Sequence, residues 1–145
     1  MHEAKIEQTV AGRLPADDGW FVLNLDEIGW RTIPGNGTWC VFESPDARSQ
    51  TLGIGVHVLW PGEANGMYHR ESEQEGFLVL SGECLAIVEG QERRLGPWDY
   101  FHCPPGTDHI TVGRPRRGFP GNDVTHFSRA WPPPSAGIAL KSPAG

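Results

Sequence analysis

The residues most suited to chemistry lie in the stretch MYHRESEQEGFLVLSGE (67–83), where His69, Glu71, Glu73 and Glu75 occupy alternate positions. Alternate residues of a β-strand point to the same side, so we expect His69 and Glu71 to share one face. Glu75 opens the apolar run that follows, and a tight connection before it would return its carboxylate to the first pair. Glu73 is expected to be a solvated loop charge. An imidazole and two carboxylates are thus predicted to converge.

Converging carboxylates need a compensating charge, because burying them without partners at the mouth of an apolar interior is costly. A divalent cation supplies this charge and keeps the carboxylates ionised and the imidazole neutral. His109 follows the turn PPGTD and begins the apolar run HITV, which makes it the natural fourth ligand. The alternative role for Glu75 is a hydrogen bond to backbone amides. Glu71 could instead be a substrate-facing base or form an outward salt bridge to Arg70 or Arg93.

The elements that must position these residues read as strands. Runs rich in β-branched and aromatic residues alternate with Gly, Pro, Asn and Asp turn signals, and no long window shows a helical apolar period. The sequence therefore predicts an all-β protein whose antiparallel hairpins close into a sandwich or barrel. The predicted strands are WFVLN (20–24), TWCVFE (38–43), TLGIGVHVLW (51–60), GFLVLSG (76–82), CLAIVEG (84–90), WDYFHC (98–103) and HITV (109–112).

Composition limits the function classes. A chain of 145 residues with 38% hydrophobic residues suits one domain with a single core. The net charge is −6 and the longest basic cluster is the short RPRR at 114–117, which argues against nucleic-acid binding. No segment approaches a membrane span or a signal peptide, so we expect a cytoplasmic protein. The three cysteines lack paired spacing, so neither disulfides nor a cysteine zinc site is expected.

The chain is predicted to divide into an N-terminal arm (1–18), a barrel (19–130) and a C-terminal tail (131–145). After residue 113 the sequence becomes dense in Pro and Gly, and only DVTHFSR (123–129) alternates like a closing strand. Either this segment completes the barrel or the ending is poorly ordered. A shifted reading frame is a further explanation of such an ending.

The residues around the predicted site are similar to the two motifs of the cupin superfamily. The first cupin motif has the form G-x5-H-x-H-x3/4-E-x6-G, and His69, Glu75 and Gly82 occupy its His, Glu and final Gly positions. Glu71 replaces the second histidine, and Glu63 stands at the position of the first glycine. An H-x-E first motif of this kind resembles that of small single-domain bacterial cupins.

The second cupin motif has the form G-x5-P-x-G-x2-H-x3-N. Pro104, Gly106 and His109 match it, whereas Trp98 stands at the first glycine and Gly113 at the final asparagine. The resemblance covers about residues 50–113. It implies a double-stranded β-helix, or jelly-roll barrel, of RmlC-like type.

In metal-binding cupins these motif positions hold one metal ion. The resemblance therefore implies His69, Glu71, Glu75 and His109 as ligands of one divalent transition metal, which could be Zn, Mn, Fe or Ni. Two imidazoles and two carboxylates form a harder and more anionic donor set than three imidazoles and one carboxylate. Such a site is expected to be a weaker electrophile toward a bound ligand.

We expect the substrate pocket to be lined by Phe77 and Val79, which are in phase with Glu75, and by Phe101 and Cys103 on one face of the predicted strand WDYFHC (98–103). The resemblance leaves two functions open. One is a metal-dependent enzyme of dioxygenase or isomerase type acting on a small oxygen-rich metabolite. The other is a non-catalytic protein that binds a small molecule or a metal for sensing or storage. The resemblance also implies a homodimer paired through edge strands or an N-terminal strand, and a monomer is equally compatible with the sequence.

Overall fold

The fold was analysed in a computed structural model, which describes residues 1–10, 12–45, 47–48, 51–115 and 136–141. In the last of these ranges only the backbone is described. All regular elements of these residues are strands, as predicted. Within the same ranges, no helix combines the length and hydropathy that a membrane crossing requires.

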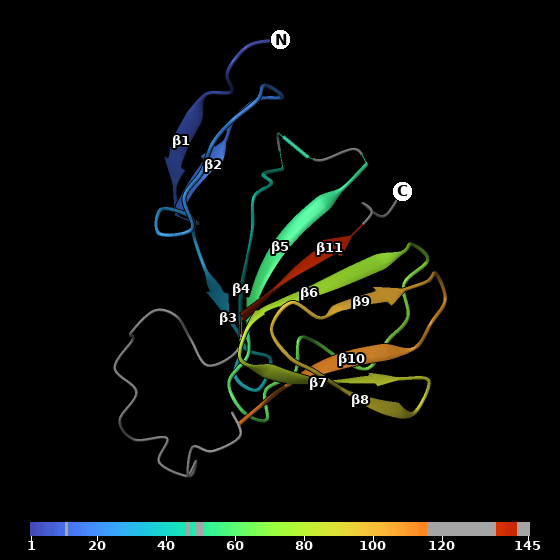
Figure 1. The fold of residues 1–145 in the computed structure, drawn as a ribbon. Coiled ribbons are helices and arrows are strands. Elements are labelled where there is room, and N and C mark those ends of the chain that lie inside the picture. Colours follow the sequence, from blue (N-terminus) through green and yellow to red (C-terminus); the bar gives the residue numbers. More distant parts are fainter. Residues whose placement is uncertain (11, 46, 49–50, 116–135, 142–145) are drawn as a thin grey trace, which may run out of the picture.

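The strands form a separate hairpin and two larger sheets (Figure 1). The hairpin pairs β1 with β2, the small sheet has the order β10-β7-β8, and the large sheet has the order β3-β4-β5-β11-β6-β9. The two larger sheets belong to an all-β jelly roll. The strands are β1 (Ile6–Thr9), β2 (Gly12–Pro15), β3 (Arg31–Thr32), β4 (Thr38–Val41), β5 (Gly53–Val58), β6 (Glu75–Ser81), β7 (Glu83–Val88), β8 (Gln91–Leu95), β9 (Tyr100–Cys103), β10 (His109–Arg114) and β11 (Ala136–Lys141).

The inner face of the large sheet is set by the pairing of β6 with β9. Glu75 lies opposite Cys103 and Phe77 opposite Phe101, and residues directly opposite one another point to the same side. Glu75, Phe77 and Cys103 are all buried. This face therefore forms the wall of the interior that the small sheet closes.

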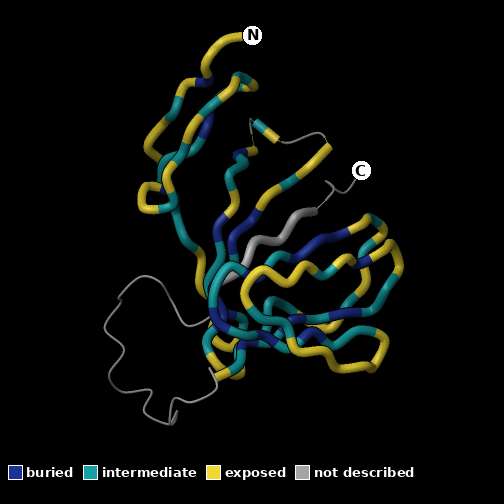
Figure 2. The backbone as a smooth tube through the Cα atoms, viewed as in Figure 1, coloured by how far each residue is buried: buried dark blue, intermediate teal, exposed yellow. Residues whose placement is uncertain are grey.

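The outer face of the large sheet carries a second core. Ile28 packs with Cys40 of β4 and Val56 of β5, all at most 5% exposed. The partly buried side chains that pack against this cluster include Leu14 of the hairpin, so the predicted arm contributes to this core. Figure 2 shows that buried residues lie along the central strands, whereas the residues of the edge strand β8 are mostly exposed.

The structure differs from the prediction at residues 20–24 and at β8 (Gln91–Leu95). Residues 20–24 are not a strand, because beyond the parallel bridge between Glu3 and Trp20 they have no ladder partner among the described residues. Their alternating burial reflects packing of every second side chain. In addition, β8 was not predicted, since its sequence QERRL contains no alternating apolar residues and four of its five positions are exposed.

The C-terminal segment contains a strand later than expected. β11 lies in the segment that the sequence suggested to be a tail, and it pairs with both β5 and β6. The expected closing strand at 123–129 lies outside the described residues.

Candidate metal centre

Three of the four predicted ligands meet between the two sheets. Ligand atoms of His69, Glu75 and His109 all lie within 4.8 Å of one another. Glu75 is the first residue of β6 and His109 the first of β10, so each sheet contributes one ligand. His69 comes from the loop before β6. The side chains of Glu75 and His109 are 2% and 1% exposed, and that of His69 is 30% exposed.

Backbone hydrogen bonds fix the two histidines relative to each other. The His69 amide donates to the His109 carbonyl at 3.2 Å, and the His109 amide donates to the His69 carbonyl at 2.8 Å. This pairing places the two rings 4.9 Å apart between their centroids. The two motifs are thus joined by a short antiparallel bridge that brings both imidazoles to the same point.

Backbone carbonyls also fix which nitrogen of each ring faces the centre. Nδ1 of His69 lies 2.6 Å from the Met67 carbonyl, and Nδ1 of His109 lies 3.0 Å from the Thr107 carbonyl. A carbonyl oxygen can only accept, so each Nδ1 must carry the hydrogen and donate it. In the neutral imidazole the lone pair then belongs to Nε2, as in metal-binding histidines that donate from their other nitrogen.

The contact between Glu75 and His109 has the character of a metal-ligand pair. Oε2 of Glu75 lies 2.9 Å from Nε2 of His109. With the hydrogen of the neutral ring on Nδ1, both atoms present lone pairs, so a proton or a cation is needed to hold them together. Two atoms bonded to one ion at about 2.1 Å would be about 3.0–3.4 Å apart for bond angles between a right angle and the tetrahedral angle, close to the separation of this pair. The residues therefore fit a divalent ion.

Glu71 lies beside this group rather than within it. Its Oε1 is 3.3 Å from Nε2 of His69, and its side chain is 40% exposed. The outward alternative to Arg70 is not formed, because Arg70 makes a two-pronged pair with Asp108 at 2.7 and 2.6 Å. Glu71 is thus directed toward Nε2 of His69, but it is not in the set of mutually close ligand atoms. Its role as fourth ligand stays a prediction.

The family described as Cupin domain matches residues 55–114, which include all four predicted ligands. Residues 55–114 of this chain form a cupin domain. Curated proteins offer no significant sequence match.

Solved structures similar to this cupin share its fold at low sequence identity. KdgF from Halomonas sp. has a TM-score of 0.62 and 23% identity, over 84% of this chain and 94% of that one. An RmlC-like cupin from Shewanella frigidimarina has a TM-score of 0.61 and 19% identity, over 84% and 89%. The DMSP lyase DddQ from Ruegeria pomeroyi has a TM-score of 0.55 and 20% identity, over 79% and 55%. At these identities the likeness establishes the fold alone.

The predicted aromatic wall of the cupin site surrounds His109. The rings of Phe77 and Phe101 stack at 5.4 Å, and each meets the His109 ring edge-on, at 5.5 and 6.1 Å. Val79 is buried on the same face of β6. These side chains keep water from the buried side of the imidazole.

Cys103 lies behind His109 rather than in an open pocket. Its Sγ is 3.2 Å from Nδ1 of His109, and the residue is 1% exposed. Burial, and secondarily the nearby Glu75 carboxylate, raises the pKa of the thiol to about 11. The thiol is therefore protonated at neutral pH and supports the ring as a neutral neighbour.

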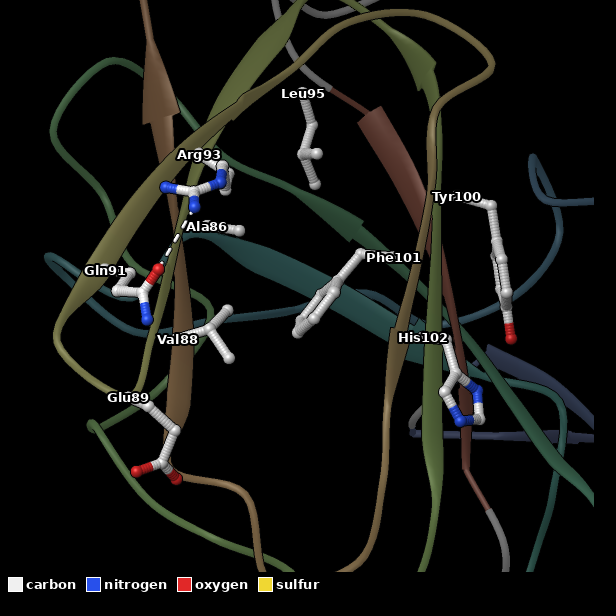
Figure 3. Close-up of a pocket in the computed structure, with 9 residues that line it drawn as sticks. All are labelled: Ala86, Val88, Glu89, Gln91, Arg93, Leu95, Tyr100, Phe101 and His102. Atoms are coloured by element: carbon white, nitrogen blue, oxygen red, sulfur yellow. Dashed lines mark hydrogen bonds between the residues drawn. The ribbon is translucent and has the colours of Figure 1, made fainter.

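An open pocket that sequence analysis missed lies next to this wall (Figure 3). Its volume is about 390 Å³, and of the four predicted pocket residues only Phe101 lines it. Its residues come from β7 and β8 of the small sheet, from the turn between them and from β9 of the large sheet. β8 carries no apolar pattern, so no sequence signal marked its residues. The lining residues are Ala86, Val88, Glu89, Gln91, Arg93, Leu95, Tyr100, Phe101 and His102.

Proposed function

We propose that this cupin binds one divalent transition metal ion, Zn, Mn, Fe or Ni, through His69, Glu75 and His109, with Glu71 as fourth ligand. We further propose that it is a metal-dependent enzyme, of dioxygenase or isomerase type, acting on a small oxygen-rich metabolite. One observation supports the centre above all others. Both imidazoles are held through Nδ1 by backbone carbonyls, and ligand atoms of His69, Glu75 and His109 lie within 4.8 Å of one another between the sheets.

Each residue of the site would have a separate role. A bound divalent ion supplies Lewis-acid chemistry, or redox chemistry if the ion is iron or manganese. His69, Glu75 and His109 hold it, and the Phe77 and Phe101 rings exclude water from its buried side. Glu71 lies on the exposed side, beside His69, from where its carboxylate would complete the ligand set.

Metal analysis of the purified protein tests the centre. We expect about one equivalent of a transition metal per chain after metal-replete growth, and less than about a tenth of an equivalent in His109→Ala. His102→Ala is the matched control, because His102 is an exposed histidine on β9 that lies outside the site. A wild-type protein without bound metal would contradict the proposal.

A non-catalytic sensor or storage function is the second candidate. It is favoured by the donor set, because two carboxylates would neutralise a divalent ion and weaken its action as an electrophile. Oxygen consumption and product formation with candidate metabolites, compared between wild type and His69→Ala, distinguish the two. Turnover that disappears in His69→Ala supports the enzyme, whereas ligand binding without turnover supports the sensor.

Three further features stay predictions from the sequence. They are a cytoplasmic location, a homodimer formed through edge strands, and a small-molecule ligand as the partner in place of nucleic acid or membrane. Gel filtration with light scattering would test the dimer.

A further inference from the structure

A guanidinium group lines the open pocket beside the proposed metal centre. Arg93 is in the middle of β8, the edge strand of the small sheet. It lies opposite Ala86 of β7, which in turn lies opposite Thr111 of β10. Paired residues share a face, so Arg93 is on the same face as Thr111. Thr111 follows His109 by two positions and therefore shares its side of β10. Arg93 is thus on the interior face.

The neighbouring arginine provides a direct contrast. Arg94 is on the opposite face of β8 and lies 4.0 Å from the Glu83 carboxylate. Arg93 instead donates to the Gln91 side-chain oxygen at 3.0 Å and to the Glu92 carbonyl at 2.8 Å. Within the described ranges Arg93 forms no ion pair with a carboxylate. Its charge is therefore not neutralised by a described acidic side chain.

The pocket leads from Arg93 toward the proposed metal ligands. Val88 lines the pocket and lies directly opposite His109 on β10. Phe101 also lines it and contacts the His109 ring. Figure 3 shows Arg93, Val88, Leu95 and Phe101 around one space, with Tyr100 and His102 on the other side of β9. Two strand spacings, about 10 Å, separate the backbones of β8 and β10.

We propose that Arg93 binds a carboxylate group of the ligand, so that the ligand is a small organic acid with an apolar middle. This inference rests on the proposed metal centre only for the other end of the ligand, which would place oxygen atoms on the metal. The apolar side chains of Val88, Leu95 and Phe101 suit a short carbon chain between the two ends. A guanidinium can bind both oxygens of a carboxylate.

The charges of the pocket favour a carboxylate over a phosphate. Arg93 is the single Lys or Arg among the described lining residues, and Glu89 adds a carboxylate at the rim. The Glu89 side chain accepts a hydrogen bond from the Asp108 amide at 2.7 Å, which holds it away from Arg93 at the β7–β8 turn. One guanidinium matches the single charge of a carboxylate, whereas a doubly charged phosphate would require more positive charge than this pocket contains.

A structural role for Arg93 makes a different prediction. Charged residues that point inward on edge strands also prevent edge-to-edge aggregation. If that were the only role of Arg93, its removal would increase aggregation and leave ligand binding unchanged.

Calorimetric titration with simple diacids tests the inference. Zn(II)-loaded wild type, Arg93→Ala, Arg93→Lys and Arg94→Ala are titrated with malonate, succinate, glutarate and adipate, and with the monoamide of each. We expect wild type to bind at least one diacid about 10-fold or more tightly than its monoamide, as a charge-assisted hydrogen bond predicts. Arg93→Ala should lose this preference, Arg93→Lys should keep part of it, and Arg94→Ala should keep all of it.

The outcomes separate this inference from the metal centre. Equal binding of diacid and monoamide by wild type overturns it, as does an unchanged preference in Arg93→Ala or no diacid binding at all. If the protein takes up no zinc, the metal centre fails, and the same titrations are made on the metal-free protein. An Arg93-dependent preference there would support the carboxylate site by itself, and its absence would overturn it.

Discussion

Glu71 and Glu75 belong to one motif but occupy opposite environments. Glu75 is buried and within 2.9 Å of His109, whereas Glu71 is two-fifths exposed, lies 3.3 Å from His69 and is outside the set of mutually close ligand atoms. A buried ligand is held in place by the fold, whereas an exposed carboxylate loses side-chain freedom when it binds. The two carboxylates should therefore contribute unequally to metal affinity.

We predict that Glu75→Gln weakens metal affinity more than about 100-fold and Glu71→Gln only about 10-fold. Both substitutions remove one charge and keep the side-chain size, so each is the control for the other. Competition with a chromophoric chelator measures both affinities. An unchanged affinity in Glu71→Gln would remove Glu71 from the ligand set, and equal losses would make it a full ligand.

Site residues could be predicted from the sequence where their role depends on the type of side chain. His69, Glu75 and His109 were recognisable because imidazoles and carboxylates stand at spacings typical of a metal site. The carbonyls of Met67 and Thr107, which orient the two rings, were not predictable because every residue has a carbonyl. Arg93 was considered only as a salt-bridge partner, because its strand was not recognised.

At the scale of elements, strands with a buried face were predictable and the exposed edge was not. β5, β6, β7, β9 and β10 overlap runs rich in β-branched and aromatic residues. β8 is held by its ladder to β7 and by a two-residue turn at Glu89 and Gly90, both at positive φ. An edge strand can form without apolar alternation, because its neighbour supplies the hydrogen bonds.

The two positions at which this chain departs from the second cupin motif, Trp98 and Gly113, differ in backbone conformation and surroundings. Trp98, at the usual glycine, adopts φ 72°, so the glycine conformation is kept although the residue is not. Gly113, at the usual asparagine, lies against another backbone segment. A Cβ at Gly113 would be 2.4 Å from the Trp60 carbonyl oxygen, and Gly113 also exchanges hydrogen bonds with residues 62–63.

We therefore predict that restoring the motif residue with Gly113→Asn destabilises the protein by about 3 kcal/mol, because the backbone of β10 must move away. Gly90→Ala is the control, since its Cβ meets nothing within 4 Å and only its φ of 73° opposes the substitution. It should cost about 1 kcal/mol. Urea unfolding measures both, and a neutral or stabilising Gly113→Asn would show that the close approach is not rigid.

At the scale of the whole molecule, each face of the large sheet belongs to a separate core, and each core contains a buried thiol. Cys40 belongs to the outer core, and Cys84 is on the inner face of β7. Burial raises the pKa of each thiol from 9.0 to about 11, with a backbone hydrogen bond to Val56 opposing it at Cys40 and the Asp99 charge adding to it at Cys84.

A raised pKa in the folded state means that the unfolded chain loses these protons first as the pH rises. The contribution of these thiols to stability is therefore fully present below about pH 9. It should be lost between about pH 9 and 11, which lowers the free energy of unfolding by roughly 2 kcal/mol for each thiol. Urea unfolding in reducing buffer from pH 7 to 11 measures the fall. Cys84→Ala should make the decline shallower, whatever its stability at pH 7, and an unchanged slope would contradict the assignment.

The proposed metal ion would connect the two sheets of the molecule. Glu75 begins β6 of the large sheet and His109 begins β10 of the small sheet, while His69 belongs to the loop between β5 and β6. A ligand that binds only the folded state stabilises it by about 4 kcal/mol when its concentration is 1,000 times Kd. Chelation should therefore weaken the junction between the sheets.

We predict that EDTA lowers the Tm of the metal-loaded protein by about 10 °C, since about 4 kcal/mol corresponds to a shift of this size in a domain of this length. His109→Ala should melt at the same temperature with and without EDTA, because it has no ion to lose. His102→Ala, with its exposed outer histidine, should respond like wild type. Differential scanning calorimetry measures all three proteins. A wild-type Tm that EDTA leaves unchanged would mean that the contacts between the sheets, including the 2.9 Å pair of Glu75 and His109, hold the barrel together without metal.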